Sequence, residues 1–158
     1  MSERKQKLEA LGYPIDRINP EGDLIRGVVV DGTTIYASGQ VPFDGSELKY
    51  VGKVPSQISV EDSEKAAALC AANLLRAVHR HLGDLEKVER ILRITGYVNA
   101  DSDFTESHLV INGASELVRE IFGDAGQHAR SALGLAQLPL GVSVEVEMIL
   151  KLKAEFRS

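Results

Sequence analysis

The sequence is poor in the residues that build disulfides, cysteine-rich metal sites and aromatic surfaces. It contains one cysteine, Cys70, no tryptophan, and only 5% aromatic residues. A lone cysteine cannot form an intramolecular disulfide and excludes zinc sites made of cysteine clusters. Cys70 lies on the apolar stripe expected for a helix over residues 59–82, so we expect it in the core. Nothing in this composition suggests an oxidising compartment.

Long apolar runs and excess positive charge are also missing. No stretch reaches the roughly 18 apolar residues of a membrane-spanning helix. The charged start, residues 1–7, is followed by no apolar segment of the signal-peptide kind, so we expect a cytoplasmic protein with no membrane partner. Asp and Glu number 23 against 18 Lys and Arg, a formal charge of −5. That balance disfavours a nucleic acid as partner.

Metal and phosphate motifs are not found either. The four histidines are His79, His81, His108 and His128, and their spacing does not place them with carboxylates on one face. Neither a dinucleotide-binding glycine motif nor a Walker motif occurs. We therefore predict no bound metal and no cofactor.

The length, 158 residues, suits one domain with a workable core. Residues 1–23 are polar and carry several glycines and prolines, which predicts an N-terminal arm with a short helix. Residues 24–158 are then a single domain. Its hydrophobic content of 44% is typical of globular proteins.

Strand and helix patterns alternate along this domain. Asp31-Gly32 between two β-rich runs predicts a hairpin with a type I′ turn. The further elements expected are a short strand near 49–52, helices over 59–82 and about 104–122, and strands over 88–98, 130–135 and 143–153. Gly113 inside the second long helix indicates close packing there. The order β-β-α-β-α-β-β predicts an α/β (α+β) fold with two helices on one face of a mixed sheet of about five strands.

The last strand alternates in character, with Val144, Val146 and Met148 on one side and charged residues beside Ile149 on the other. The helices can cover only the first side. The second side, partly apolar, favours contact with a partner subunit.

Two charged residues on the last strands could form a small-acid site. Arg130 begins one strand, and Glu145 lies on the non-helical face of the next, so we expect them to meet across a hairpin. An arginine fork pairs with a carboxylate through two hydrogen bonds, and a nearby carboxyl can orient a water for proton transfer. On spacing alone, a structural ion pair or two separately solvated charges explain these residues better than a binding site does.

Short motifs then add a resemblance. The segments Ala37 to Pro42, Ala129-Arg130-Ser131, Leu138-Pro139 and Val144 to Glu147 resemble the signature of the RidA/YjgF family of enamine/imine deaminases, also labelled endoribonuclease L-PSP. The resemblance covers residues 24–153 and fits a longer subgroup of that family. It implies a chorismate-mutase-like fold and a homotrimer that binds small carboxylate metabolites in clefts between subunits.

The resemblance also implies residue roles. Arg130 would bind the substrate carboxylate and Glu145 would position the attacking water. Gly39 would offer its backbone N–H, and Asn112 would lie near the cleft. Ser38 is a further substrate-binding candidate, although it could equally fix its loop.

Two positions depart from the family pattern. Leu24 stands where a tyrosine is common, and Ala132 stands where a cysteine is common. His128 precedes Arg130 by two residues, a place where a plain surface histidine is also expected.

Three functions follow from these observations. The first is a hydrolase of the 2-iminobutanoate/2-iminopropanoate deaminase type, which would form 2-oxo acids and ammonia. Leu24 and Ala132 favour the second, a non-catalytic trimer that binds small carboxylates. The third, an endoribonuclease or translation inhibitor, is disfavoured by the acidic balance and the few aromatic residues.

Overall fold

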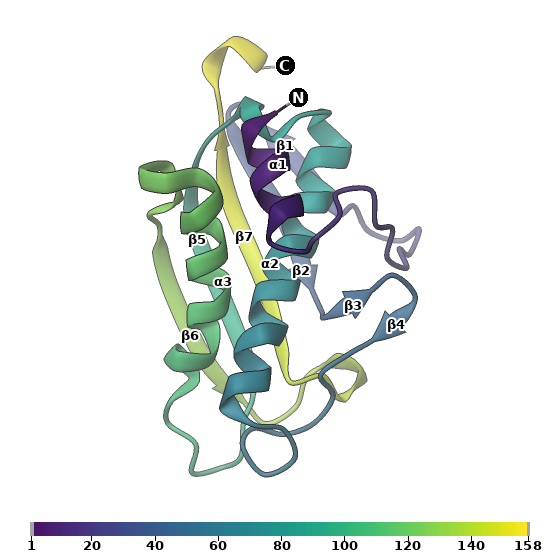
Figure 1. The fold of residues 1–158 in the computed structure, drawn as a ribbon, viewed down its shortest axis with the longest axis vertical. Helices are drawn as coiled ribbons and strands as arrows, with labels where there is room; N and C mark the ends of the chain where they lie inside the picture. The colour runs from purple at the N-terminus through teal and green to yellow at the C-terminus, as the bar shows by residue number, and fades with distance from the viewer. Residues whose placement is uncertain (1, 158) are drawn as a thin grey trace.

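A five-stranded sheet with two long helices on one face forms the body of the protein (Figure 1). The computed structural model describes residues 2–157. The helices are α1 (Glu3–Ala10), α2 (Val60–Leu82) and α3 (Ser107–Phe122); the strands are β1 (Val28–Asp31), β2 (Thr34–Gln40), β3 (Phe43–Asp44), β4 (Glu47–Leu48), β5 (Val88–Asn99), β6 (Ala129–Leu135) and β7 (Val144–Leu152). The expected order of long elements and the α+β class are confirmed.

The strand order in the sheet is β1-β2-β7-β5-β6. Only β5 and β6 run parallel, joined by the α3 crossover, and all other neighbours are antiparallel. The expectation that the last two strands form a hairpin is therefore wrong. Both edges of β7 are already paired, with β2 and β5, so β6 takes the free edge of β5 instead.

The first hairpin is confirmed, but its turn type is not. Asp31 pairs with Thr34, so the two-residue loop is Gly32-Thr33. Only Gly32 has a positive φ, +60°, whereas a type I′ turn needs positive φ at both loop residues. Glycine at the first loop position is the arrangement of a type II′ turn.

Helix boundaries follow their capping residues. The Ser59 hydroxyl accepts a hydrogen bond from the Asp62 N–H at 3.1 Å and starts α2, and Gly83 ends it with φ +84°. The second long helix begins at Ser107, later than expected, because Asp101 and Phe104 form a turn just before it.

The two helices pack against each other at a glycine. A Cβ on Gly113 would lie 2.0 Å from the backbone oxygen of Glu64, which confirms the close packing expected there. Beneath them, Val144, Val146 and Met148 point into the core, and Cys70 is fully buried, as expected.

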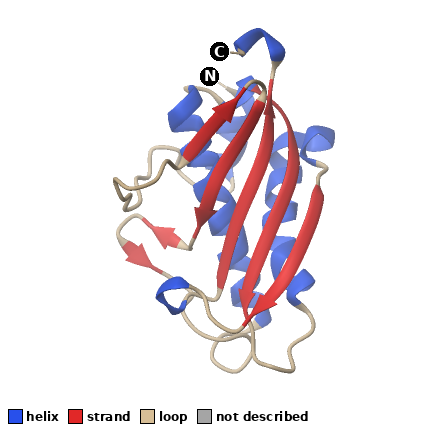
Figure 2. Ribbon diagram, turned by 180° about the vertical axis from the view of Figure 1, so that it is seen from behind, coloured by secondary structure: helices blue, strands red, loops and turns tan. Residues whose placement is uncertain are grey.

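The opposite face of the sheet is free of helices, as Figure 2 shows. Register places Val29, Tyr36 and Ile149 on this face in three successive strands. Val29 is 50% exposed and Tyr36 48%. Further along the face, Leu133 is 47% exposed opposite Tyr97.

The N-terminal arm contains the expected short helix, α1. Arg4 ties it to the body by donating to the backbone oxygens of Leu85 and Val88. The rest of the arm is mostly exposed, and the Leu24 side chain, just after it, is 96% exposed.

The short strand expected near 49–52 is not formed. A small hairpin of β3 and β4 lies just before that segment instead. Among residues 2–157, no helix combines the length and apolar character needed to cross a bilayer.

Candidate functional site

Arg130 lies at the start of the edge strand β6 and points beneath α3. Its register partner on β5 is Ile94, a buried residue, so its side chain leaves the sheet on the helical side. The guanidinium Nη1 donates to Asn112 Oδ1 at 2.9 Å and to Ser115 Oγ at 3.2 Å. Asn112 and Ser115 are three residues apart and so share one face of α3. Arg130 and Asn112, each predicted from the sequence as a site residue, are thus brought together.

These contacts leave one edge of the guanidinium open. Both Nη1 hydrogens are used, while Nη2 makes only a long contact of 3.5 Å to the backbone oxygen of His108. Within the described residues, Nε has no hydrogen-bond partner. The Nε and Nη2 edge is the one that can present two parallel N–H groups to a carboxylate.

His128 lies behind this group, half-buried. Its Nε2 is 2.9 Å from Ser115 Oγ, and its Nδ1 is 2.6 Å from the backbone oxygen of Gly126. Burial lowers the pKa of His128, although the Gly126 contact raises it and the charges of Arg130 and Arg119 lower it again. The interpretation of His128 as a plain surface residue is therefore wrong, because a serine and a carbonyl hold both ring nitrogens.

Sequence reasoning did not find Ser115. The signal was its spacing of three residues after Asn112, which puts both side chains on the surface of α3 that β6 approaches. We call Arg130, Asn112, Ser115 and His128 the arginine cluster.

Glu145 lies elsewhere, on the helix-free face of β7 and opposite Tyr97 of β5. Its carboxyl group leans over the backbone of β2: a Cβ on Gly39 would lie 2.9 Å from Glu145 Oε1. The glycine therefore makes the room that the carboxyl occupies. Burial raises the pKa of Glu145, and the negative charge of Glu147 raises it further.

Gly39 owes its position to an irregularity in β2. The register with β7 shifts between Ala37 and Gln40, so Ser38 and Gly39 have no partner residue on β7. Such bulges redirect backbone and side chains next to binding sites. The Ser38 hydroxyl donates to the backbone oxygen of Arg26 at 2.6 Å, so in this chain it ties β2 to the segment just before β1. We call Glu145, Gly39 and Ser38 the glutamate cluster.

The expectation that Arg130 and Glu145 meet across a hairpin is wrong for a single chain. Strand β5 separates their strands, and their side chains leave opposite faces of the sheet. One chain therefore holds two separate clusters, one around the guanidinium of Arg130 and one around the carboxyl of Glu145.

The two positions that depart from the family pattern lie outside both clusters. Leu24 projects from the exposed arm. Ala132 pairs with Gly96 on the helical side of β6 and packs in part against the core.

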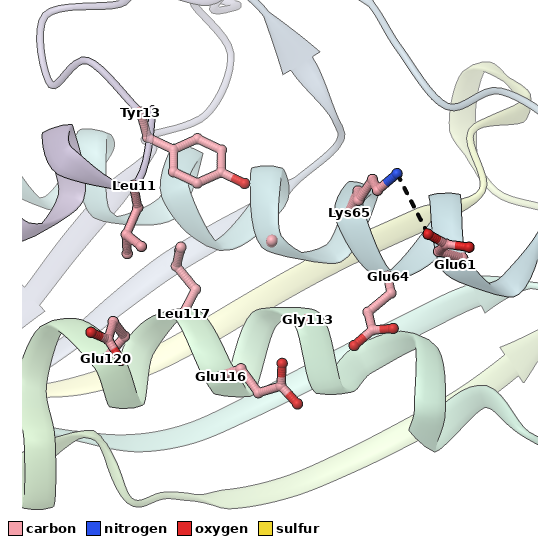
Figure 3. A pocket seen from close by; sticks show the side chains of 10 residues that line it. Leu11, Tyr13, Glu61, Glu64, Lys65, Gly113, Glu116, Leu117 and Glu120 are labelled. Carbon is pink, nitrogen blue, oxygen red and sulfur yellow. Dashed lines mark ion pairs between the residues drawn. The ribbon is translucent and has the colours of Figure 1, made fainter.

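A separate groove runs between α2 and α3 on the outer side of the molecule (Figure 3). Its volume is about 490 Å³, and its apolar floor includes Leu11, Tyr13 and Leu117. Carboxylates from both helices line the rim, and one of them, Glu61, makes an ion pair with Lys65 at 4.0 Å. The groove shares no residue with either cluster.

Known proteins resemble this chain over most of its length. Residues 18–152 match the family described as "YjgF/chorismate mutase-like, putative endoribonuclease". Protein TCP17 of Trypanosoma cruzi is 37% identical over 125 residues, which cover 78% of each chain.

Solved structures agree with this match. The Agrobacterium tumefaciens protein Atu1372, whose function is described as unknown, is 36% identical, with a TM-score of 0.88 over 95% of this chain and 92% of that one. A Shewanella oneidensis protein described as a "putative endoribonuclease" is 25% identical, with a TM-score of 0.89 over 96% of this chain and 100% of its own.

Proposed function

Since the chain belongs to the RidA/YjgF family, we propose that it hydrolyses reactive imines of amino acids to 2-oxo acids and ammonia. The observation that carries the proposal is the open edge of Arg130, held in place by Asn112 and Ser115. A planar carboxylate is the natural partner of such an edge. The substrate class is therefore a small 2-imino acid.

The proposal includes an assembly in which a neighbouring subunit completes each site. Arg130 and Glu145 of one chain are separated by β5, so they can serve one substrate only if they come from different copies. We propose a homotrimer that buries the helix-free face of the sheet. The exposed Val29, Tyr36 and Leu133 on that face support such contact. The arginine cluster of one subunit then lies against the glutamate cluster of the next.

The chemistry needs no cofactor. Water adds through its oxygen to the imine carbon, and one of its protons passes by way of Glu145 to the imine nitrogen, which gives a carbinolamine. The carbon–nitrogen bond then breaks while the proton of the new hydroxyl passes to the nitrogen. Ammonia leaves, a carbonyl remains, and Glu145 returns to its starting state.

Each cluster contributes a distinct part of this reaction. Arg130 holds the carboxylate, so the imine carbon is fixed relative to the water. The buried surroundings of Glu145 raise the pKa of its carboxyl, which makes proton return easier near neutral pH. The backbone N–H of Gly39 can donate to the substrate, because Gly39 lies outside the paired register of β2 and β7.

The test is ammonia release from freshly generated imines of several amino acids, with wild type, Arg130→Ala and Glu145→Ala compared at equal assembled protein. We expect turnover in wild type and its loss in both variants. Sedimentation of each variant separates loss of chemistry from loss of assembly. No release above the uncatalysed background from any imine would refute the deaminase.

A second function, a trimer that binds small carboxylates without turnover, is favoured by Leu24 and Ala132 at the two departing positions. It predicts a thermal shift with 2-oxobutyrate that disappears in Arg130→Ala, with no ammonia release. RNA cleavage is a weaker alternative, since a formal charge of −5 disfavours an RNA surface. RNA binding that weakens steeply as salt is added would support this alternative.

A further inference from the structure

His128 and Ser115 form a chain of hydrogen bonds that ends on Arg130. The first contact joins His128 Nδ1 to the backbone oxygen of Gly126 at 2.6 Å, in the short 3-10 helix η2 (Gly123–Gly126). The second joins His128 Nε2 to Ser115 Oγ at 2.9 Å. The third joins Arg130 Nη1 to the same Oγ at 3.2 Å.

The direction of these bonds follows from the chemistry of each group. A carbonyl oxygen only accepts, so Nδ1 of His128 carries a proton and donates it. In the neutral ring Nε2 is then a bare acceptor, and the Ser115 hydroxyl donates to it. An arginine only donates, so the remaining lone pairs of Ser115 face Arg130. In this series of three hydrogen bonds, every donor therefore has an acceptor.

We infer that His128 is a positioning residue for the carboxylate site: its neutral ring fixes the Ser115 hydroxyl and, through it, the guanidinium of Arg130. This inference rests on the proposed function, because it concerns how Arg130 is held ready for the substrate carboxylate. Asn112 holds the other Nη1 hydrogen at 2.9 Å, so the two helix side chains together set the plane of the guanidinium.

The charges around His128 favour the neutral ring that this role needs. Arg130 at the start of β6 and Arg119 on α3 are both positive, and η2 contributes the Gly126 carbonyl. Burial and these two cations lower the pKa of His128 in the folded protein. The neutral ring therefore prevails at neutral pH, and protonation begins only below the ordinary value of about 6.5. A protonated ring cannot accept from Ser115 and adds a cation beside Arg130.

Calorimetric binding of 2-oxobutyrate at pH 7.5 tests the inference with four variants. Ser115→Ala removes a hydrogen bond to the charged guanidinium, and we expect it to weaken binding about tenfold. His128→Leu leaves the Ser115 hydroxyl without its acceptor, so the hydroxyl can turn away from Arg130, and we expect binding to weaken in this variant too. His128→Gln keeps an oxygen that can accept from Ser115, so its affinity should stay within about twofold of wild type. His81 is exposed in the last turn of α2, so His81→Gln is the control and should bind like wild type.

A pH series separates positioning from a structural role. Wild-type affinity should fall below pH 6.5, while His128→Gln, which keeps Glu145 but lacks the ring, should show no such fall. Equal losses in His128→Gln and His128→Leu, or affinity that rises toward acid in wild type alone, would overturn the inference. Nitrogen-15 spectra of His128 at pH 7.5 give an independent check, since a ring protonated at Nε2 contradicts it without any ligand.

Failure of the proposed function looks different. If wild type does not bind the probe, or if Arg130→Ala binds it normally, the carboxylate site itself is refuted and the inference falls with it. If Arg130→Ala abolishes binding while Ser115→Ala and His128→Leu bind like wild type, only the role of His128 is refuted.

Discussion

The arginine cluster and the glutamate cluster are built in opposite ways. Arg130 is held by side chains of the same chain, with Asn112 and Ser115 on one helix and His128 behind them. Glu145 is placed instead by a missing side chain, since Gly39 leaves the space beside its carboxyl. The guanidinium of Arg130 is therefore held in place within one chain by hydrogen bonds. Among the described residues the carboxyl of Glu145 has no such partners, and its properties depend on burial and on the groups that come to lie next to it. Substrate binding and water activation should respond to different mutations.

Among the variants that distinguish the two clusters, those of Arg130 should have the largest effect, a loss of affinity for 2-oxobutyrate. Arg130→Ala removes both N–H groups of the open edge and should weaken 2-oxobutyrate binding by at least about a hundredfold. Arg130→Lys keeps the charge without the planar fork, so its loss should be smaller than that of alanine but still larger than tenfold, roughly. Calorimetry measures both. Lysine that binds as well as arginine would show that charge alone, and not fork geometry, makes the site.

A change at Gly39 should affect turnover and leave the arginine cluster intact. In Gly39→Ala the new methyl would lie 2.9 Å from Glu145 Oε1, so the carboxyl must move. A displacement of about 1 Å can cost a hundredfold in rate, so we expect kcat to fall at least tenfold, roughly. Steady-state ammonia release gives kcat. Calorimetry gives the affinity for 2-oxobutyrate, which should stay the same as in wild type. Equal losses of both would mean that the two clusters are not separable.

The contrast between the clusters also explains what could be predicted from the sequence. Periodicity and capping residues such as Ser59 and Gly83 predicted the long elements because they depend on local interactions. The neighbours of β6 could not be predicted in that way, since strand order depends on which sheet edge remains free. Adjacent strands in sequence suggested that Arg130 and Glu145 meet, but β5 lies between them. Ser115 was missed because its role depends on packing against β6.

A smaller effect is expected where the segment before β1 meets the glutamate cluster. Ser38→Ala removes the hydroxyl bond to the Arg26 backbone at an exposed position, and it should lower the free energy of unfolding by about 0.5 to 1 kcal/mol. The segment around Arg26 should loosen with little change in 2-oxobutyrate affinity, because Ser38 does not touch Arg130. Limited proteolysis near residues 20–26 measures the first effect. Ser38→Thr keeps the hydroxyl and is the matched control.

The smallest effect is a pH dependence of stability at Glu145. Within a single folded chain its pKa is raised, mainly by burial, so the fold of that chain favours the protonated carboxyl. The stability that Glu145 contributes is full below the ordinary pKa of about 4.3 and is lost as pH rises through the folded value. Glu145→Gln, which is always neutral, should therefore match wild type in acid and exceed it near pH 7. The gain should stay below roughly 1 kcal/mol, because Glu145 is only partly buried and solvent screens its charge.

Urea unfolding at several pH values measures this difference, with Glu147→Gln as the control. Glu147 accepts a hydrogen bond from the Tyr97 hydroxyl at 2.8 Å and is exposed on the same face. Its substitution should remove part of the negative charge that acts on Glu145 but not the burial. A variant Glu145→Gln that is less stable than wild type at pH 7 would mean that the carboxylate is stabilised in the fold. The glutamate cluster would then resemble the arginine cluster, with its charge held by partners.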